Sequence, residues 1–222
     1  MRPGELTAAA DCGLDEPLRI SGSAMIIGSI IIAIMATAFA IIGGRPLIVT
    51  FLPGLALVWL IYLWLYKSKR NLPGGRALYP IFFGTLSWQF LHFFEEFATG
   101  FRVRFPELYS ASPYSAELFV GINMVSYFVF AISFIVATEK RIAPLYIPAL
   151  FFVIYGGMGN AIAHPLWAVY TGGYFPGLFT SIPYWFLAPA VLSYFVGGFA
   201  RAFTIAIFFS VILVPILIIT AS

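Results

Sequence analysis

Long apolar runs dominate this chain, and short polar or glycine- and proline-containing segments interrupt them. An apolar run of about 20 residues is long enough to cross a bilayer as an α-helix. Seven such runs predict seven membrane-spanning helices. They cover residues 23–42, 47–66, 77–98, 116–137, 145–167, 178–197 and 202–220.

The boundary between the last two runs is the least distinct, because only Gly197, Gly198 and Arg201 interrupt it. Six spans, with the C-terminal part packed as one bent element, are therefore an alternative to seven. Either number predicts an all-α, polytopic transmembrane helical bundle. We expect residues 23–222 to form a single integral-membrane domain, preceded by a polar cytoplasmic tail over residues 1–22.

The composition supports this class of protein and excludes others. Hydrophobic residues make up 61% of the chain and charged residues 9%, against roughly 25% charged residues in a soluble domain. The formal net charge of +3 is small and spread along the chain, so no nucleic-acid partner is expected. The single cysteine, Cys12, allows no intrachain disulfide. The tail is too acidic for a cleavable signal peptide, so we expect the first span to be retained.

Lysine and arginine are divided unevenly between the two sides of the predicted bundle. Nine lie on the side of the N-terminal tail and three on the opposite side. The nine are Arg2, Arg19, Lys67, Lys69, Arg70, Arg76, Lys140, Arg141 and Arg201, and the three are Arg45, Arg102 and Arg104. Because cytoplasmic loops carry the excess of positive charge, we expect the N-terminus in the cytoplasm and the C-terminus outside. The chain is thus predicted to be a multi-pass protein of the cytoplasmic (inner) membrane.

Three ionisable residues, His92, Glu95 and Glu96, interrupt the apolar run 77–98. A charged group at membrane depth costs about 3 kcal/mol or more, so such groups usually face the protein interior or a wet cavity. Positions i, i+3 and i+4 share one helix face, so the three side chains are expected to point in broadly the same direction.

The other histidine of the chain, His164, lies in the run 145–167 together with Asn160, four residues earlier. The runs 77–98 and 145–167 start on the same side of the membrane, which places both polar sets in the outer halves of their helices. We therefore expect one site near the outer leaflet, built from two helices that run in the same direction. Tyr174, in the uncharged turn that follows, can hydrogen-bond into this site.

These residue types are typical of three kinds of chemistry. Neighbouring carboxylates in a low dielectric resist double ionisation, so one of them can exchange a proton with a substrate, with a histidine as partner. His92, Glu96 and His164 also form a ligand set for zinc or non-haem iron. Buried Glu and His side chains relay protons or cations in transporters. A purely structural role, in which the polar groups pin two helices together, is the remaining alternative.

The order of these residues resembles that of the HXXEE-domain membrane proteins. That family is defined by an H-x-x-E-E motif, a further histidine and a Y-x-P-G motif. In this chain the three elements are His92-Phe-Phe-Glu95-Glu96, His164 and Tyr174-Phe-Pro176-Gly177. The resemblance covers residues 77–177 and implies that these residues act together. The function of the family is not established, so the resemblance implies no reaction.

A weaker likeness concerns the chemistry of the site alone. The sterol-isomerase-like (EXPERA) membrane proteins also place a histidine and a glutamate four residues apart on one transmembrane helix, as His92 and Glu96 are. In those enzymes carboxylates move a proton at a carbon–carbon double bond of a lipid. The later motifs of that family are not evident in this chain.

The leading hypothesis from the sequence is a membrane enzyme that acts on a hydrophobic, lipid- or isoprenoid-like substrate within the bilayer. The reaction would be an isomerisation, a hydration or a hydrolysis. Glu95 or Glu96 would be the general acid–base and His92 its partner. The further donors or orienting groups would be Asn160, His164 and Tyr174. This version needs no cofactor.

Two alternatives stay open. In a metal-dependent version, His92, Glu96 and His164 hold a zinc or iron ion, and Glu95 acts as a base on bound water. In a proton- or cation-coupled transporter, or a protein that binds a lipophilic ligand, the same residues form the binding site. The remaining spans carry no charged residue well inside them, which favours an enzyme or a binding protein over a transporter.

Overall fold

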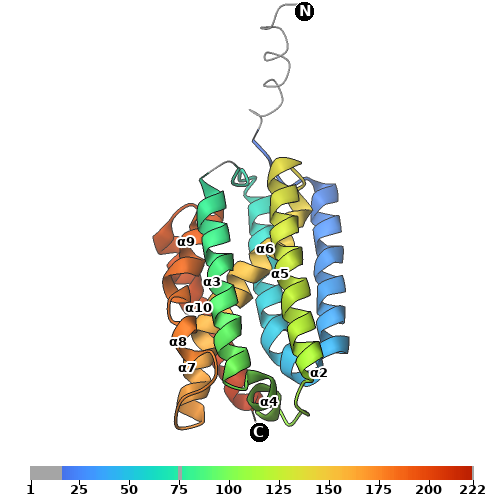
Figure 1. Cartoon of the computed structure of the whole chain (residues 1–222). Helices are drawn as coiled ribbons and strands as arrows, with labels where there is room; N and C mark the ends of the chain where they lie inside the picture. Colours follow the sequence, from blue (N-terminus) through green and yellow to red (C-terminus); the bar gives the residue numbers. More distant parts are fainter. Residues whose placement is uncertain (1–16, 75–76, 222) are drawn as a thin grey trace, which may run out of the picture.

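Helices account for the regular secondary structure of the described residues, 17–74 and 77–221, in this computed structural model (Figure 1). Within those ranges no strand occurs, so the predicted all-α class is confirmed. The α-helices are α2 (Gly22–Lys67), α3 (Leu78–Ala98), α4 (Phe101–Glu107), α5 (Ala116–Glu139), α6 (Tyr146–Phe151), α7 (Asn160–Tyr170), α8 (Leu178–Ser181), α9 (Tyr184–Val196) and α10 (Phe199–Thr220). A 3₁₀ turn, η1 (Ala143–Leu145), precedes α6, and a π-helix, η2 (Phe152–Gly159), follows it. Most of the predicted tail, including Cys12, lies outside the described residues.

Helix α2 contains the first two predicted spans, because the chain turns back at Gly44 (Figure 1). Gly44 has φ +60° and ψ −151°, a conformation that only glycine adopts readily. The two legs then lie side by side. The Tyr62 hydroxyl of the second leg donates to the carbonyl of Ala24 in the first, at 3.2 Å. A Cβ at Gly28 would lie 2.7 Å from the Tyr62 ring, so this glycine permits the close approach.

Five helical stretches of the described chain are long and apolar enough to cross a membrane. They are Gly22–Lys67, Ala116–Glu139, Ala143–Tyr170, Leu178–Val196 and Phe199–Thr220. The first of them contributes two legs, and α3 also runs the length of the bundle (Figure 1). The polar residues of α3 lower its hydropathy relative to the other spans. The fold therefore accommodates the seven predicted spans, and the chain is a membrane protein.

The stretch Ala143–Tyr170 forms the centre of the bundle. Of the residues in its most apolar segment 89% are buried, compared with 6% in the corresponding segment of α2. Helices α2, α5, α9 and α10 pack around it. Because protein surrounds this stretch on its sides, it can carry polar side chains that lipid does not reach.

The predicted boundary between the last two spans falls at a sharp break in the helix. Gly197 and Gly198 have φ values of +85° and +141°, and they separate α9 from α10. A Cβ at position 197 would lie 2.4 Å from the Arg70 guanidinium. Arg70 donates to the carbonyl of Val196 at 3.1 Å, so this close approach ties the end of α9 to the loop after α2.

The central stretch contains a π-helix, η2, which the sequence pattern did not predict. This region carries the glycines 156, 157 and 159, which remove side-chain bulk where helices approach each other. A Cβ at Gly157 would lie 2.6 Å from the Cβ of Ala188 in α9. π-Helical segments occur often at functional sites, and this one ends immediately before Asn160.

Candidate functional site

Helix α3 presents the two glutamates of its motif to different surroundings. Its buried residues recur every three or four positions and form one continuous face: Leu78, Phe82, Thr85, Leu86, Gln89, His92 and Glu96. On this face His92 is fully buried and Glu96 is 5% exposed. Glu95 points away from this face and is only partly buried.

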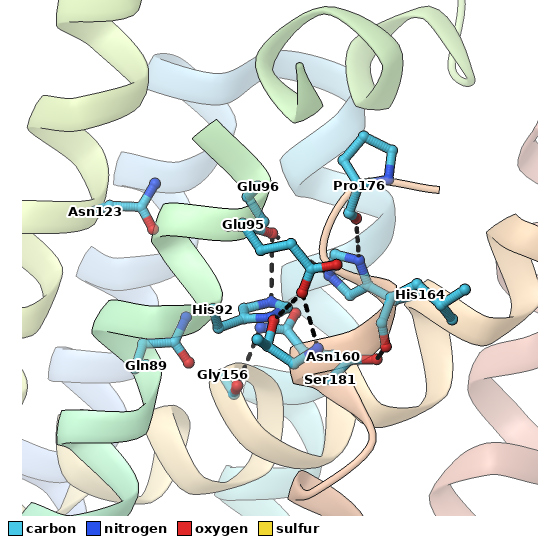
Figure 2. A network of polar contacts seen from close by, with 12 residues as sticks. Gln89, His92, Glu95, Glu96, Asn123, Gly156, Asn160, His164, Pro176 and Ser181 are labelled. Atoms are coloured by element: carbon cyan, nitrogen blue, oxygen red, sulfur yellow. Dashed lines mark hydrogen bonds and ion pairs between the residues drawn. The ribbon is translucent and has the colours of Figure 1, made fainter. Parts of the chain in front are cut away.

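His164 of α7 meets the buried face of α3 (Figure 2). Its Nε2 atom lies 3.4 Å from Oε1 of Glu96, and Nε2 of His92 lies 3.5 Å from the same oxygen. The three potential ligand atoms lie within 4.8 Å of one another. The structure thus brings His92, Glu96 and His164 from two helices into one buried group, called the His–Glu cluster below.

Both histidines of the His–Glu cluster are held through the other nitrogen of the ring. Nδ1 of His164 lies 2.6 Å from the carbonyl oxygen of Pro176, and a carbonyl only accepts, so this Nδ1 carries a proton. Nδ1 of His92 lies 2.8 Å from Oγ1 of Thr180. The Thr180 hydroxyl donates its proton to Oε2 of Glu95, so its oxygen accepts from His92. Both Nδ1 atoms are therefore donors.

A neutral imidazole that is protonated at Nδ1 has a bare lone pair at Nε2. Both Nε2 atoms are buried, and neither has the geometry of a hydrogen bond, although both lie within ion-pair distance of Glu96. Three electron-rich atoms thus converge in a largely buried space. Leaving a buried polar atom unpaired costs about 1–3 kcal/mol. A metal ion at the centre would satisfy all three atoms, whereas a proton would join the Glu96 oxygen to one of the two nitrogens.

The donor set of the His–Glu cluster fits a divalent metal ion. A tetrahedral ion with ligand bonds of about 2.1 Å holds its ligand atoms about 3.4 Å apart. The two nitrogen–oxygen separations are 3.4 and 3.5 Å. Metal-binding histidines also usually donate their second N–H to a carbonyl or a carboxylate, as His164 does directly and His92 does through Thr180. Three protein ligands leave a position for water or substrate.

Glu95 binds the turn between α7 and α9 and does not join the His–Glu cluster directly. Its Oε1 accepts from the Tyr174 hydroxyl at 2.7 Å and from the Phe179 amide at 3.1 Å. Its Oε2 accepts from the Thr180 amide at 2.8 Å and from the Thr180 hydroxyl. Burial and the bond to Glu95 raise the pKa of Tyr174, so this phenol remains a donor. Glu95 reaches His92 only through Thr180.

The Y-x-P-G motif folds the chain onto both imidazoles. Tyr174 binds Glu95, and the carbonyl of Pro176 orients His164. Gly177 has φ +85°, and a Cβ there would lie 2.5 Å from Cε1 of His164. The same Cβ would lie 2.9 Å from the His92 ring, so only glycine fits this position.

Aromatic side chains enclose the His–Glu cluster. The ring of His164 lies 5.3 Å from that of Phe101 and 5.2 Å from that of Trp167, and Tyr184 lies 5.7 Å from His92. Phe101 begins α4, the short helix that covers this end of the bundle (Figure 1). Such apolar surroundings strengthen the electrostatic interactions within the cluster.

A cavity of about 80 Å³ lies beside Glu96, between α2, α3, α5 and the central stretch. Its walls are mainly aromatic and include Phe51, Phe101, Phe105, Phe119, Phe130, Phe151 and Phe152. Asn160, a predicted member of the site, lies on the wall of this cavity. Its side-chain amide donates to the carbonyl of Gly156 at 3.0 Å, so the structure places Asn160 next to the cluster but does not hydrogen-bond it to either histidine.

A chain of hydrogen bonds borders the cavity, and the sequence patterns did not indicate its members. The Tyr184 hydroxyl donates to Oε1 of Gln89, and Nε2 of Gln89 donates to the Tyr127 hydroxyl at 3.1 Å. That hydroxyl donates to Oδ1 of Asn123 at 2.9 Å. One signal was available in the sequence, because Gln89 lies three residues before His92 and shares its helix face.

Comparison with known proteins places this site within one family. Residues 85–194 match a family model described as "Protein of unknown function with HXXEE motif". The matched range contains the H-x-x-E-E motif, His164 and the Y-x-P-G motif. No curated protein and no solved structure gives a significant match, and the weaker likeness to the EXPERA proteins gains no support. Through residues 85–194, which hold the His–Glu cluster and both motifs, this chain belongs to the HXXEE family.

Proposed function

We propose that the protein is a membrane-embedded, metal-dependent enzyme that hydrolyses or hydrates a lipophilic substrate. One observation carries this proposal: two Nε2 lone pairs converge on one carboxylate oxygen at 3.4 and 3.5 Å. The sequence alone favours an enzyme without a cofactor, whereas the geometry of the site favours a metal-dependent one. The reason is that Pro176 and Thr180 fix the protons on the far sides of the two imidazoles.

Each residue then has a definite role. A divalent ion held by the cluster supplies a Lewis acid and an activated water. His92 and His164 offer neutral nitrogen ligands, and Glu96 offsets part of the positive charge. Glu95 is a positioning residue, because it orients His92 through Thr180.

The substrate is proposed to be lipophilic because of the cavity next to Glu96. Its walls carry aromatic rings from three parts of the chain, as expected for a site that buries an apolar ligand. Asn160 shares these walls with Glu96 and is proposed to orient the reacting group. The cavity thus supplies the binding surface, and the His–Glu cluster supplies the chemistry.

A metal-free acid–base enzyme is the second candidate. It is supported by the position of Glu96, whose single oxygen lies within 3.5 Å of both His92 and His164. A proton shared among these groups would replace the metal ion, and Glu96 would be the general acid–base. The two candidates use the same residues and differ in metal content.

We further propose that the protein is a multi-pass protein of the inner membrane, with a cytoplasmic N-terminus and the site near the outer leaflet. Basic residues at the ends of α2 and α5 and the start of α10 support this orientation. Helix α4 and the turn at Gly44 lie at the opposite end (Figure 1), and fewer basic residues occur there.

Lipid profiling of reconstituted protein tests the enzymatic proposal. The full chain, loaded with zinc or iron, is incubated in liposomes made from a total lipid extract, and the lipids are followed by mass spectrometry. We expect wild type, but not Glu96→Gln, to consume a lipid species, and a chelator to stop the reaction. Glu107→Gln, an exposed carboxylate at the end of α4, is the matched control and should retain activity. Identical lipid profiles for wild type and Glu96→Gln would contradict the proposal.

A further inference from the structure

We propose that the cavity beside Glu96 binds an uncharged amphiphilic lipid, and that Gln89 and Asn123 select it by donating hydrogen bonds to an oxygen of its head group. This inference names the substrate class of the same site and therefore rests on the proposed function. The matching head groups contain an ester, amide or hydroxyl oxygen. The observation behind this proposal is that Gln89 and Asn123, both labelled in Figure 2, line a cavity whose walls are mainly apolar.

In this chain of hydrogen bonds, the side-chain amides of Gln89 and Asn123 each use only one of their two N–H groups. Gln89 accepts at Oε1 from Tyr184 and gives one N–H to Tyr127. Asn123 accepts at Oδ1 from Tyr127 and gives one N–H to the carbonyl of Phe119 at 2.9 Å. A side-chain amide has two N–H groups, so Gln89 and Asn123 each keep a second donor in these bonds.

These donors favour a ligand that carries an acceptor. Gln89 is 4% exposed and lines the cavity, and Asn123 lines the cavity from α5. Ser126, three residues after Asn123, adds a hydroxyl to the same wall. An unpaired donor in apolar surroundings is costly, so a ligand oxygen that accepts from these groups would bind favourably.

The charges around the cavity exclude an anionic head group. Among the cavity-lining residues of the described chain, Glu96 is the sole charged side chain, and none is Lys, Arg or His. A phosphate or carboxylate bound at Gln89 and Asn123 would therefore be buried without a cationic side chain to pair with it. Gln89 precedes Glu96 by seven residues, which is about 10 Å along the helix axis, so an ion held by the cluster would not pair with a group bound there.

The aromatic walls of the cavity indicate that the other part of the proposed ligand is apolar. Phe51 from α2, Phe130 from α5 and Phe152 from η2 face the cavity. The cavity measures about 80 Å³, so it would hold the head group and the adjoining part of a hydrocarbon chain rather than a whole lipid. A single-chain lipid with a neutral, oxygen-bearing head group could accept hydrogen bonds from Gln89 and Asn123 and pack its chain against the aromatic walls.

Binding of three ligands with hydrocarbon chains of equal length tests this inference. The probes are monoolein, oleoyl lysophosphatidic acid and 1-octadecene, offered to the full chain in detergent after metal removal by chelation. We expect monoolein to bind at least tenfold more tightly than either of the others. Gln89→Met and Asn123→Leu should each weaken monoolein binding roughly fivefold to tenfold, because each removes about one hydrogen bond. Ser133→Ala, a buried change on α5 outside the cavity lining, should leave binding unchanged.

The outcomes separate this inference from the proposed function. Equal binding of the three probes, tighter binding of lysophosphatidic acid, or wild-type affinity in both variants would overturn the inference, even if the protein proves to be a metal enzyme. Selective monoolein binding that depends on Gln89 and Asn123 supports it, even if no metal or turnover is found. Thermal melting of each variant checks folding. If Gln89→Met unfolds, the binding affinity of Asn123→Leu decides the test. Asn123 donates to Phe119 within α5, so its loss removes no hydrogen bond from this N–H between helices.

Discussion

Nδ1 of His92 lies 2.8 Å from Oγ1 of Thr180, and the same hydroxyl donates to Glu95. Thr180 therefore joins the first and fourth residues of the H-x-x-E-E motif through the turn that follows α7. The two glutamates of the motif consequently act on different partners. Glu96 faces the imidazoles, whereas Glu95 fixes the segment after α7 that orients both of them through Pro176 and Thr180.

Thr180→Val should weaken metal binding about tenfold to a hundredfold, the usual effect of removing a residue that orients a metal ligand. The change removes the oxygen that holds Nδ1 of His92 and breaks its link to Glu95. Chelator competition on purified protein measures the affinity. Thr180→Ser keeps the hydroxyl and should bind the metal ion nearly as tightly as the wild type does. Thr204→Val, at an exposed position of α10, is the matched control. Unchanged affinity in Thr180→Val would show that this hydroxyl does not orient His92.

Gly177→Ala should abolish metal binding and lower thermal stability. Its φ is +85°, and the added methyl group would meet both imidazoles at 2.5 and 2.9 Å. Gly173→Ala provides the control within the same turn, because nothing lies within 4 Å of a Cβ there. The measurements are metal content and melting temperature. Similar values for the two alanine variants would mean that the turn does not approach the rings closely.

Glu95→Gln should lower the free energy of unfolding by about 2 kcal/mol, because hydrogen bonds to a charged carboxylate are lost from the turn. Four donors from Tyr174, Phe179 and Thr180 now reach this carboxylate. Glu117→Gln, in the first turn of α5, tests an exposed carboxylate for comparison. Denaturation in detergent gives the difference. If Glu95→Gln is as stable as Glu117→Gln, the proposed role of Glu95 in holding the turn is wrong.

Cysteine labelling tests the proposed orientation. In a Cys12→Ser background, a cysteine at Gly172 should react with a membrane-impermeant reagent added from outside, and a cysteine at Gly74 should not. The uneven distribution of lysine and arginine is the reason for this expectation. Reaction at Gly74 and protection at Gly172 would reverse the topology and move the site to the cytoplasmic leaflet.

The sequence predicted the helices and part of the site, because both depend on periodic patterns. Apolar runs defined the spans, the helical repeat placed His92 with Glu96, and the shared direction of the two spans placed His164 at a similar depth. The repeat could not decide that Glu95 faces the turn, because i+3 and i+4 both lie near His92. It also could not give the π-helix η2, whose glycines pack against partners distant in sequence. The chain from Tyr184 to Asn123 joins three helices, so only the tertiary structure reveals it.

Elemental analysis of the purified full chain tests the central claim most directly. Protein prepared in metal-replete medium should contain about one zinc or iron ion per chain, because the His–Glu cluster forms one site. His164→Ala and Glu96→Gln should lose the ion, and the exposed-carboxylate variant Glu107→Gln should keep it. A wild-type protein that contains no divalent metal and does not take up zinc or iron would contradict the account, and the shared-proton candidate would replace it.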